Sequence, residues 1–138
     1  VFEAIDKSKK KNIIINISSN LGGYENLEKK LVEKTRKYKN VYVIIDSNSV
    51  SSADYFAYDM KNEGAILIGA DTCGKWVGGP ENKLFDFPEF SVSVTLTRAY
   101  RNPAHIEGTG VSPHFYADSR NDTIEIIKNL SGDKELHL

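Results

Sequence analysis

Three short runs of nearly continuous apolar residues constrain the fold most. They are IIINI at residues 13–17, VYVIID at residues 41–46 and AILIGA at residues 65–70. Apolar runs without polar alternation are typical of strands that are covered on both faces, as in parallel sheets. The segments between them, residues 25–39 and 52–64, carry apolar side chains at helical spacing. This order of strands and helices predicts an α/β fold in which a parallel core sheet is flanked by helices.

The second half of the chain is less regular. Residues 71–83 are rich in glycine and turn formers, which predicts a loop. Residues 84–88 and 91–100 predict strands, and the second of these alternates clearly between apolar and polar side chains. Residues 101–114 predict another loop. A closing helix is expected over residues 122–130, with Asp122 as its cap.

Composition narrows the class of protein. The 138 residues are 40% hydrophobic, and 18 basic against 19 acidic side chains give a formal charge of −1. No repeat or linker is evident, so we expect residues 1–138 to form one domain with its own core. The near-zero charge disfavours nucleic acid as a partner, and the basic run Lys7–Lys11 is interpreted as a solvated helix end. The single cysteine, Cys73, excludes an internal disulfide and a Cys-rich zinc site.

The chain also lacks segments that would direct it to a membrane. No apolar stretch approaches the roughly 20 residues that a membrane span needs. The first residues, VFEAIDKSKKK, have neither a signal peptide pattern nor a starting Met. We therefore expect the sequence to be a piece of a longer protein.

A pair of glycines, Gly22 and Gly23, lies where the first strand is expected to turn into a helix. Glycines at such a turn let backbone N–H groups approach a ligand, and the helix N-terminus beyond favours negative charge. The turn could hold a phosphate or an oxyanion, or it could simply connect two elements. The spacing is not Gly-x-Gly-x-x-Gly, so a dinucleotide site is disfavoured.

Serines follow the second strand in the segment DSNSVSSADYFA, residues 46–57. A serine between a buried strand and a helix is exposed at the carboxyl edge of the sheet, where α/β proteins bind ligands. Such a serine can serve as a nucleophile. The other interpretation is that Ser51 or Ser52 only caps the helix that begins near Ala53.

A lysine, Lys75, lies in the glycine-rich loop that follows the third strand. Lysine can act as the base for a serine if burial lowers its pKa from ~10.4 toward about 7 or 8. Cys73, Trp76 and Val77 could provide the apolar surroundings. A lone loop lysine is more commonly solvated.

In this order the blocks resemble the catalytic core of the C-terminal processing peptidases, also called tail-specific proteases. The resemblance extends over roughly residues 1 to 130 and rests on four blocks. These are Asn20 with Gly22 and Gly23, Ser51 with Asp54 three residues later, Lys75 six residues after Gly69, and GTGVSP from Gly108 to Pro113.

The resemblance implies a fold similar to the Clp protease and crotonase folds and a Ser-Lys dyad that hydrolyses polypeptides. Ser51 would be the nucleophile and Lys75 the base. The backbone N–H groups of Ser52 and of Gly22 or Gly23 would form the oxyanion hole. Members of the family need no metal or organic cofactor.

The resemblance further implies that residues 1–138 are one protease core, with a PDZ-like peptide-binding region upstream in the longer protein. It favours a location outside the cytoplasm. The oligomeric state, the natural substrate and the cleavage preference stay open.

Some positions depart from the family pattern. Gly79 stands where a lysine-orienting glutamine is common, which resembles a second branch of the family whose lysine loop lacks that glutamine. Glu81 or Asn82 could orient the lysine instead. Further departures are Asn16 where Asp is common, Ser18 where Arg is common and Asp54 where Glu is common.

Other functions remain open at this stage. The domain could keep the protease fold and bind peptides without turnover. It could be a crotonase-like enzyme acting on acyl-CoA. That chemistry usually needs a carboxylate near the glycine turn, whereas Glu25 and Glu28 lie on the expected helix beyond it. His105 or His114 could replace lysine as the base, and Cys73 could be a thiol nucleophile.

Overall fold

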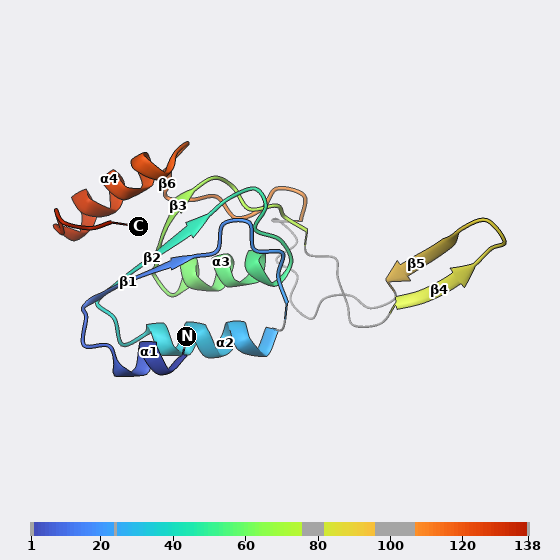
Figure 1. The fold of residues 1–138 in the computed structure, drawn as a ribbon, viewed down its shortest axis with the longest axis horizontal. Coiled ribbons are helices and arrows are strands. Elements are labelled where there is room, and N and C mark those ends of the chain that lie inside the picture. Colours follow the sequence, from blue (N-terminus) through green and yellow to red (C-terminus); the bar gives the residue numbers. More distant parts are fainter. Residues whose placement is uncertain (1, 24, 76–81, 96–106, 138) are drawn as a thin grey trace.

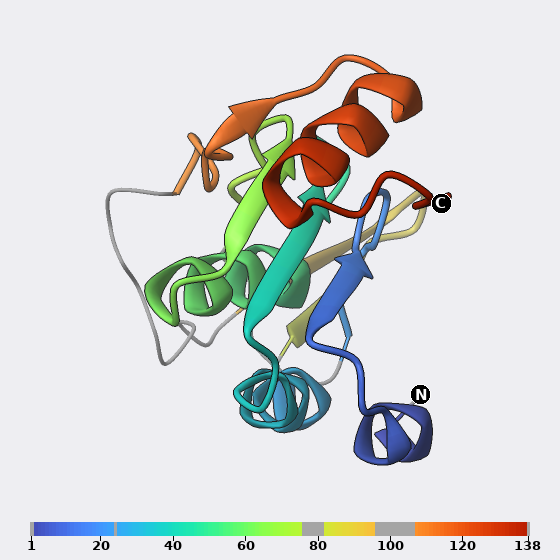
Figure 2. The ribbon, with the colours of Figure 1, turned by 90° about the vertical axis from the view of Figure 1, so that its left-hand side faces the viewer.

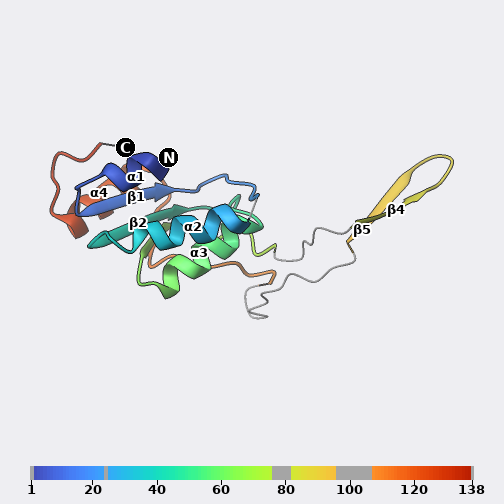
Figure 3. The same cartoon turned by 90° about the horizontal axis from the view of Figure 1, so that it is seen from below.

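The computed structural model describes residues 2–23, 25–75, 82–95 and 107–137. They form an α/β body and a two-stranded hairpin, which stands apart from the body in Figures 1 and 3. The elements are α1 (Phe2–Lys7), β1 (Asn12–Asn16), α2 (Glu25–Thr35), β2 (Asn40–Ile45), α3 (Ser52–Asn62), β3 (Ile66–Gly69), β4 (Asn82–Asp86), β5 (Ser91–Thr95), β6 (Phe115–Tyr116) and α4 (Arg120–Ser131). The predicted α/β fold is confirmed.

The body is built on a four-stranded sheet in the order β1-β2-β3-β6, and all its neighbouring strands are parallel. The three apolar runs form β1, β2 and β3, as predicted. No strand is predicted from the sequence at the position of β6. That strand has two exposed residues, Phe115 and Tyr116, which pair with Ile68 and Gly69, so it is too short to produce a pattern.

Helices cover both faces of the sheet, which explains why its strands do not alternate. α2 and α3 lie on one face and α4 on the other (Figure 2). Val43, Ile45 and Leu67 belong to the larger core cluster, which also contains side chains of α2 and α3. Tyr42 and Ile68, which point to the opposite face, are fully buried with Ile127 of α4. Among the described residues, no helix is long and apolar enough to cross a membrane.

The helix termini differ slightly from expectation. α3 and α4 match the predicted segments closely, whereas α2 ends at Thr35 rather than near residue 39. The predicted cap of α4 is wrong. Ser119 is the N-cap, and its Oγ accepts the Asp122 N–H at 3.1 Å, because a serine at that position reaches the third N–H of the helix.

The hairpin is antiparallel and exposes apolar side chains. Phe85 pairs with Val92 across β4 and β5, and each is 41% exposed. Phe87 and Phe90 stack at the tip with ring centroids 4.8 Å apart. Both predicted strands are present in part; residues 96–100 of the second lie outside the described residues.

The segment that precedes β6 packs closely on the loop after β3. Val111 N–H donates to Thr72 Oγ1 at 2.8 Å, and Thr72 N–H donates to the Val111 carbonyl at 3.2 Å. At Gly110, a Cβ atom would lie 2.0 Å from the Thr72 carbonyl oxygen, and φ is +76°. Only glycine fits this contact.

Replacing Gly110 therefore tests how firmly these segments are joined. We expect Gly110→Ala to lower the free energy of unfolding by about 3 kcal/mol or more, because the methyl group meets rigid backbone. Gly108→Ala is the matched control, since φ is +79° there but no atom lies within 4 Å of the added Cβ. It should cost only about 1–2 kcal/mol of backbone strain. Chemical denaturation measures both, and equal losses would contradict the packing argument.

Candidate active site

Three loops leave the sheet at the same edge. Residues 17–23 follow β1, residues 46–51 follow β2 and residues 70–75 follow β3. The strands are parallel, so their carboxyl ends meet at one edge, where open α/β sheets bind ligands (Figure 1). The loops carry all of the catalytic and oxyanion-hole residues expected from the sequence, except Ser52 in the adjoining first turn of α3.

Ser51 has a strained backbone. It is the residue before α3, with φ 61° and ψ −119°. An ordinary N-cap has an extended backbone, as Ser119 shows before α4 with φ −140° and ψ 162°. Such strain in a residue with a side chain costs about 1–3 kcal/mol and gathers at functional sites. Capping alone therefore does not account for the conformation of Ser51.

The glycine turn lies directly against Ser51. At Gly22, where φ is +91°, a Cβ atom would lie 2.8 Å from the Val50 carbonyl oxygen and 2.9 Å from both Ser51 Cβ and Ser52 N. Val50 N–H also donates to the Asn20 carbonyl at 2.9 Å. The structure thus brings the first two sequence blocks together, and glycine permits the close approach.

The two glycines differ in what their N–H groups can do. Gly22 N–H donates to Asn20 Oδ1 at 2.8 Å, which closes an Asx turn. Gly23 faces open space, with no atom within 4 Å of an added Cβ. Ser52 begins α3, and the first N–H groups of a helix have no intrahelical acceptor. The Gly22 N–H is therefore already bonded, whereas the N–H of Ser52 has no acceptor within its own helix.

Asp46, at the end of β2, connects the first two loops. Ser19 donates its N–H to Asp46 Oδ1 at 2.8 Å and its hydroxyl to Oδ2 at 3.0 Å. Asn48 N–H lies 3.1 Å from Oδ1, as does the Ser49 hydroxyl. Burial would raise the pKa of Asp46, but these hydrogen bonds outweigh it and hold the pKa below the ordinary carboxyl value.

The loop that carries Lys75 is bound to the serine loop through its backbone. Gly74 N–H donates to Asp54 Oδ1 at 2.9 Å, and Cys73 N–H donates to the Ser49 carbonyl at 3.0 Å. The Lys75 side chain is exposed. Within the described residues, no hydrogen bond joins it to Ser51. The structure therefore brings the two loops together through their backbones and leaves the Lys75 side chain exposed.

The fourth block of the resemblance, Gly108 to Pro113, is hydrogen-bonded to the loop that carries Lys75. Gly108 N–H donates to the Gly74 carbonyl at 2.8 Å, beside the Thr72–Val111 contacts described above. All four blocks thus meet at one edge of the sheet, although they are far apart in sequence.

A largely apolar pocket of about 570 Å³ opens beside the glycine turn. Gly22, Gly23 and Ser52 form one wall, and Glu28, which is 8% exposed, also lines it. The apolar lining consists of Phe2, Ile17, Leu27, Leu31, Ala53 and Phe56.

The sequence also matches a known protein family. The model of peptidase family S41 matches residues 24–117. The chain belongs to peptidase family S41. The resemblance to C-terminal processing peptidases is thereby confirmed at the level of the family. No curated protein matches the sequence of this S41 chain.

Two solved structures share its fold. One is the photosystem II D1 C-terminal processing protease, with a TM-score of 0.61 and 19% identity over 85% of this chain and 37% of that one. The other is the tricorn protease, with a TM-score of 0.63 and 18% identity over 93% of this chain and 14% of that one. The S41 chain therefore spans well under half the length of either.

Of the alternative catalytic residues, His114 and Cys73 lie within the described residues and His105 does not. His114 Nδ1 accepts the Leu67 N–H at 3.0 Å, and burial together with nearby Lys61 lowers the His114 pKa. This contact ties His114 to β3, and no hydrogen bond to Ser51 occurs among the described residues. Cys73 is partly buried in the lysine loop. The predictions for His105, Trp76, Val77, Gly79, Glu81 and the side chains of Glu25 and Asn82 lie outside the described residues.

Sequence reasoning missed Asp46 and the side chain of Asn20 as parts of this site. Asn20 had a usable signal, since Asn two residues before Gly favours an Asx turn. Asp46 had only its place at the end of a strand. No group of three or more His, Cys, Asp or Glu residues that could hold a metal occurs in the described parts of the chain.

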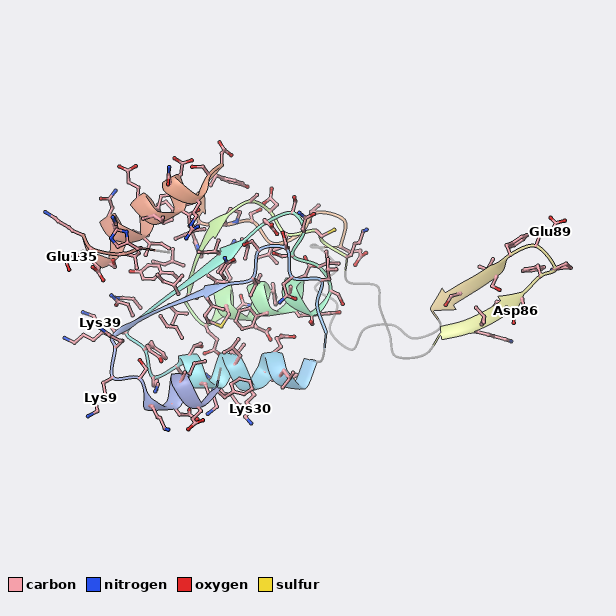
Figure 4. The ribbon with its side chains drawn as sticks, in the orientation of Figure 1. Lys9, Lys30, Lys39, Asp86, Glu89 and Glu135 are labelled. Atoms are coloured by element: carbon pink, nitrogen blue, oxygen red, sulfur yellow. The ribbon has the colours of Figure 1, made fainter. Side chains whose placement is uncertain are left out.

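The role of Asp46 predicts how stability changes with pH. Its lowered pKa stabilises the fold above the carboxyl pKa of the unfolded chain, and this contribution is lost as pH falls through the folded-state pKa. Asp46→Asn should lower the free energy of unfolding by about 1–3 kcal/mol at pH 7 and flatten its decrease toward pH 3. Glu89→Gln, at the hairpin tip (Figure 4), is the control. Equal acid sensitivity in wild type and Asp46→Asn would contradict the assignment.

Proposed function

We propose that this chain is the catalytic core of a serine peptidase in which Ser51 is the nucleophile. The observation that carries the proposal is the strained backbone of Ser51 at a strand-to-helix turn, directly beside the Gly22–Gly23 turn. A sharp turn of this kind presents a serine hydroxyl at the edge of a sheet. Membership of a peptidase family supports hydrolysis of peptide bonds as the chemistry.

The oxyanion would be bound by backbone. Ser51 Oγ attacks the peptide carbonyl carbon, and the negative charge that develops on the carbonyl oxygen needs fixed donors. The N–H groups of Gly23 and Ser52 fill this role, because the Gly22 N–H is already bonded to Asn20. The N-terminus of α3 adds a favourable dipole.

Lys75 serves as the base in this proposal. Its neutral amine takes the proton of Ser51 as the Oγ–carbon bond forms, and passes it to the leaving amine as the peptide bond breaks. Water then hydrolyses the acyl-enzyme by the same route. The side chain is exposed here. Contacts between catalytic groups tighten when substrate binds.

The substrate would be a polypeptide with an apolar side chain beside the scissile bond. The pocket of about 570 Å³ adjoins Gly23 and Ser52, so a side chain next to the bound carbonyl would enter it. The fold shared with a C-terminal processing protease favours substrate tails. As part of this proposal, the 138 residues form one core domain of a longer protein that acts outside the cytoplasm and carries a PDZ-like region upstream.

Covalent labelling tests the nucleophile and the base. A fluorophosphonate should label the wild-type chain, and Ser51→Ala should abolish labelling because no alkoxide can form. Lys75→Ala should slow labelling at pH 7 by about 10² to 10⁴-fold, the usual contribution of a general base. Mass spectrometry of the labelled peptide measures the site and the rate.

Two control variants accompany this experiment. Ser47→Ala removes an exposed serine of the same loop, and Lys39→Ala removes a lysine at the opposite end of the sheet (Figure 4). Both should label normally. Labelling that survives in Ser51→Ala would refute the assignment. Peptide binding by an unreactive wild type would instead support a binding module, and binding of a coenzyme A thioester would support the crotonase-like alternative.

The pocket predicts a preference that a peptide series can measure. Peptides with Leu or Val before the scissile bond should be cleaved more efficiently than those with Asp or Lys. Leu31→Phe adds volume to the lining, so kcat/KM for Leu peptides should fall about 10-fold or more while Ala peptides are little affected. Leu130→Phe, on α4, is the matched control. Uniform changes for all peptides would place the binding site elsewhere.

A further inference from the structure

We propose that Asp54 is a positioning residue that fixes the backbone of the nucleophile, Ser51, relative to the backbone of the loop that carries the base, Lys75, an inference that rests on the proposed function. Its side chain is 0% exposed. Oδ2 accepts the N–H of Ser51 at 2.8 Å, and Oδ1 accepts the N–H of Gly74 at 2.9 Å. Gly74 is bonded directly to Lys75, so one carboxylate connects the backbones that carry both groups.

Helix capping accounts for only half of this arrangement. A carboxylate at the third position of a helix commonly bonds the N-cap N–H, as in a capping box. The bond to Gly74 has no such role, since Gly74 is 20 residues away on another loop. Asp122 holds the same position in α4, and its Oδ2 accepts the hydroxyl of Ser119 within that helix turn. Asp54 differs in reaching a second loop.

The bond also stabilises the unusual backbone of Ser51. A strained conformation persists only where its surroundings over-determine it. Here Gly22 packs against the Ser51 Cβ position from one side, and Asp54 fixes the Ser51 N–H from the other. Losing the carboxylate would allow Ser51 to relax toward the extended backbone of an ordinary N-cap. The hydroxyl would then move away from the oxyanion donors.

The chemistry of the carboxylate predicts which substitutions are tolerated. Aspartate offers one oxygen to each N–H, whereas asparagine offers one oxygen and an NH₂ that would face an N–H. Asp54→Asn therefore breaks one of the two bonds. Asp54→Glu keeps both acceptors on a longer side chain. Glutamate is also the residue that is common at this position in the family that the chain resembles.

The test measures the rate of fluorophosphonate labelling of Ser51 in the 138-residue chain. Asp54→Asn should slow labelling about 10²-fold, the effect of misplacing a reacting group by about 1 Å. Asp54→Glu should recover at least 10-fold of this loss. Asp122→Asn, which removes the equivalent carboxylate from α4, should label at the wild-type rate.

A double-mutant cycle separates positioning from general destabilisation. If Asp54 acts through Ser51 and Lys75, Lys75→Ala should slow Asp54→Asn much less than it slows the wild type. The dependence of the labelling rate on pH should flatten in Lys75→Ala, which lacks the proposed base, and also in Asp54→Asn. Independent effects that multiply, with an unchanged pH profile, would overturn the proposal.

Amide hydrogen exchange keeps the two proposals distinguishable. In the wild type the Ser51 and Gly74 amides should be protected from exchange. Asp54→Asn should increase their exchange at least 10-fold, and Asp122→Asn should not.

If Ser51→Ala still labels, the proposed nucleophile fails. If labelling depends on Ser51 and Lys75 but Asp54→Asn reacts and exchanges like the wild type, only the positioning role fails. Should Asp54→Asn not fold, the Asp54→Glu rate decides, and a loss as large as that of Lys75→Ala refutes the role.

Discussion

The buried carboxylate of Asp54 is the interaction on which the geometry of this edge of the sheet depends. A fully buried charge is unfavourable unless it is hydrogen-bonded. The N–H groups of Ser51 and Gly74 supply those bonds, and the N-terminus of α3 favours the negative charge. Because each bond comes from a different loop, the charge is satisfied only when both loops are in place. The electrostatic requirement of one side chain thus enforces the arrangement of two segments.

Asp46 has the corresponding role between the first two loops. It collects donors from Ser19, Asn48 and Ser49, so the glycine turn and the serine loop are fixed relative to each other. The parallel sheet brings the three strand ends together, but the loops beyond them have no regular hydrogen-bond ladder. Hydrogen bonds to the carboxylates of Asp46 and Asp54 hold these loops together instead. Gly22 and Gly110 then allow backbones to approach at distances that a side chain would prevent.

How well each feature could be predicted from the sequence depends on how far apart along the chain the interacting residues lie. β1, β2 and β3 were predictable because strands covered on both faces leave continuous apolar runs. β6 was not, since its two residues depend on pairing with Ile68 and Gly69. Ser51 could be placed at its turn by local pattern and resemblance. The connection from Asp46 to Ser19 could not, because it spans 27 residues and no periodicity records it.

The candidate site has one part that backbone contacts fix and one part that they do not. Ser51 and Gly22 are positioned by backbone contacts, and the proposed oxyanion donors are backbone N–H groups. Only the backbone of the Lys75 loop is fixed in this way, while its side chain extends into solvent. In the proposed mechanism, rotamer changes of this side chain, which are fast compared with loop rearrangement, would bring its amine toward Ser51. Binding of substrate would then complete the contacts of the proposed mechanism on a backbone that is already in place.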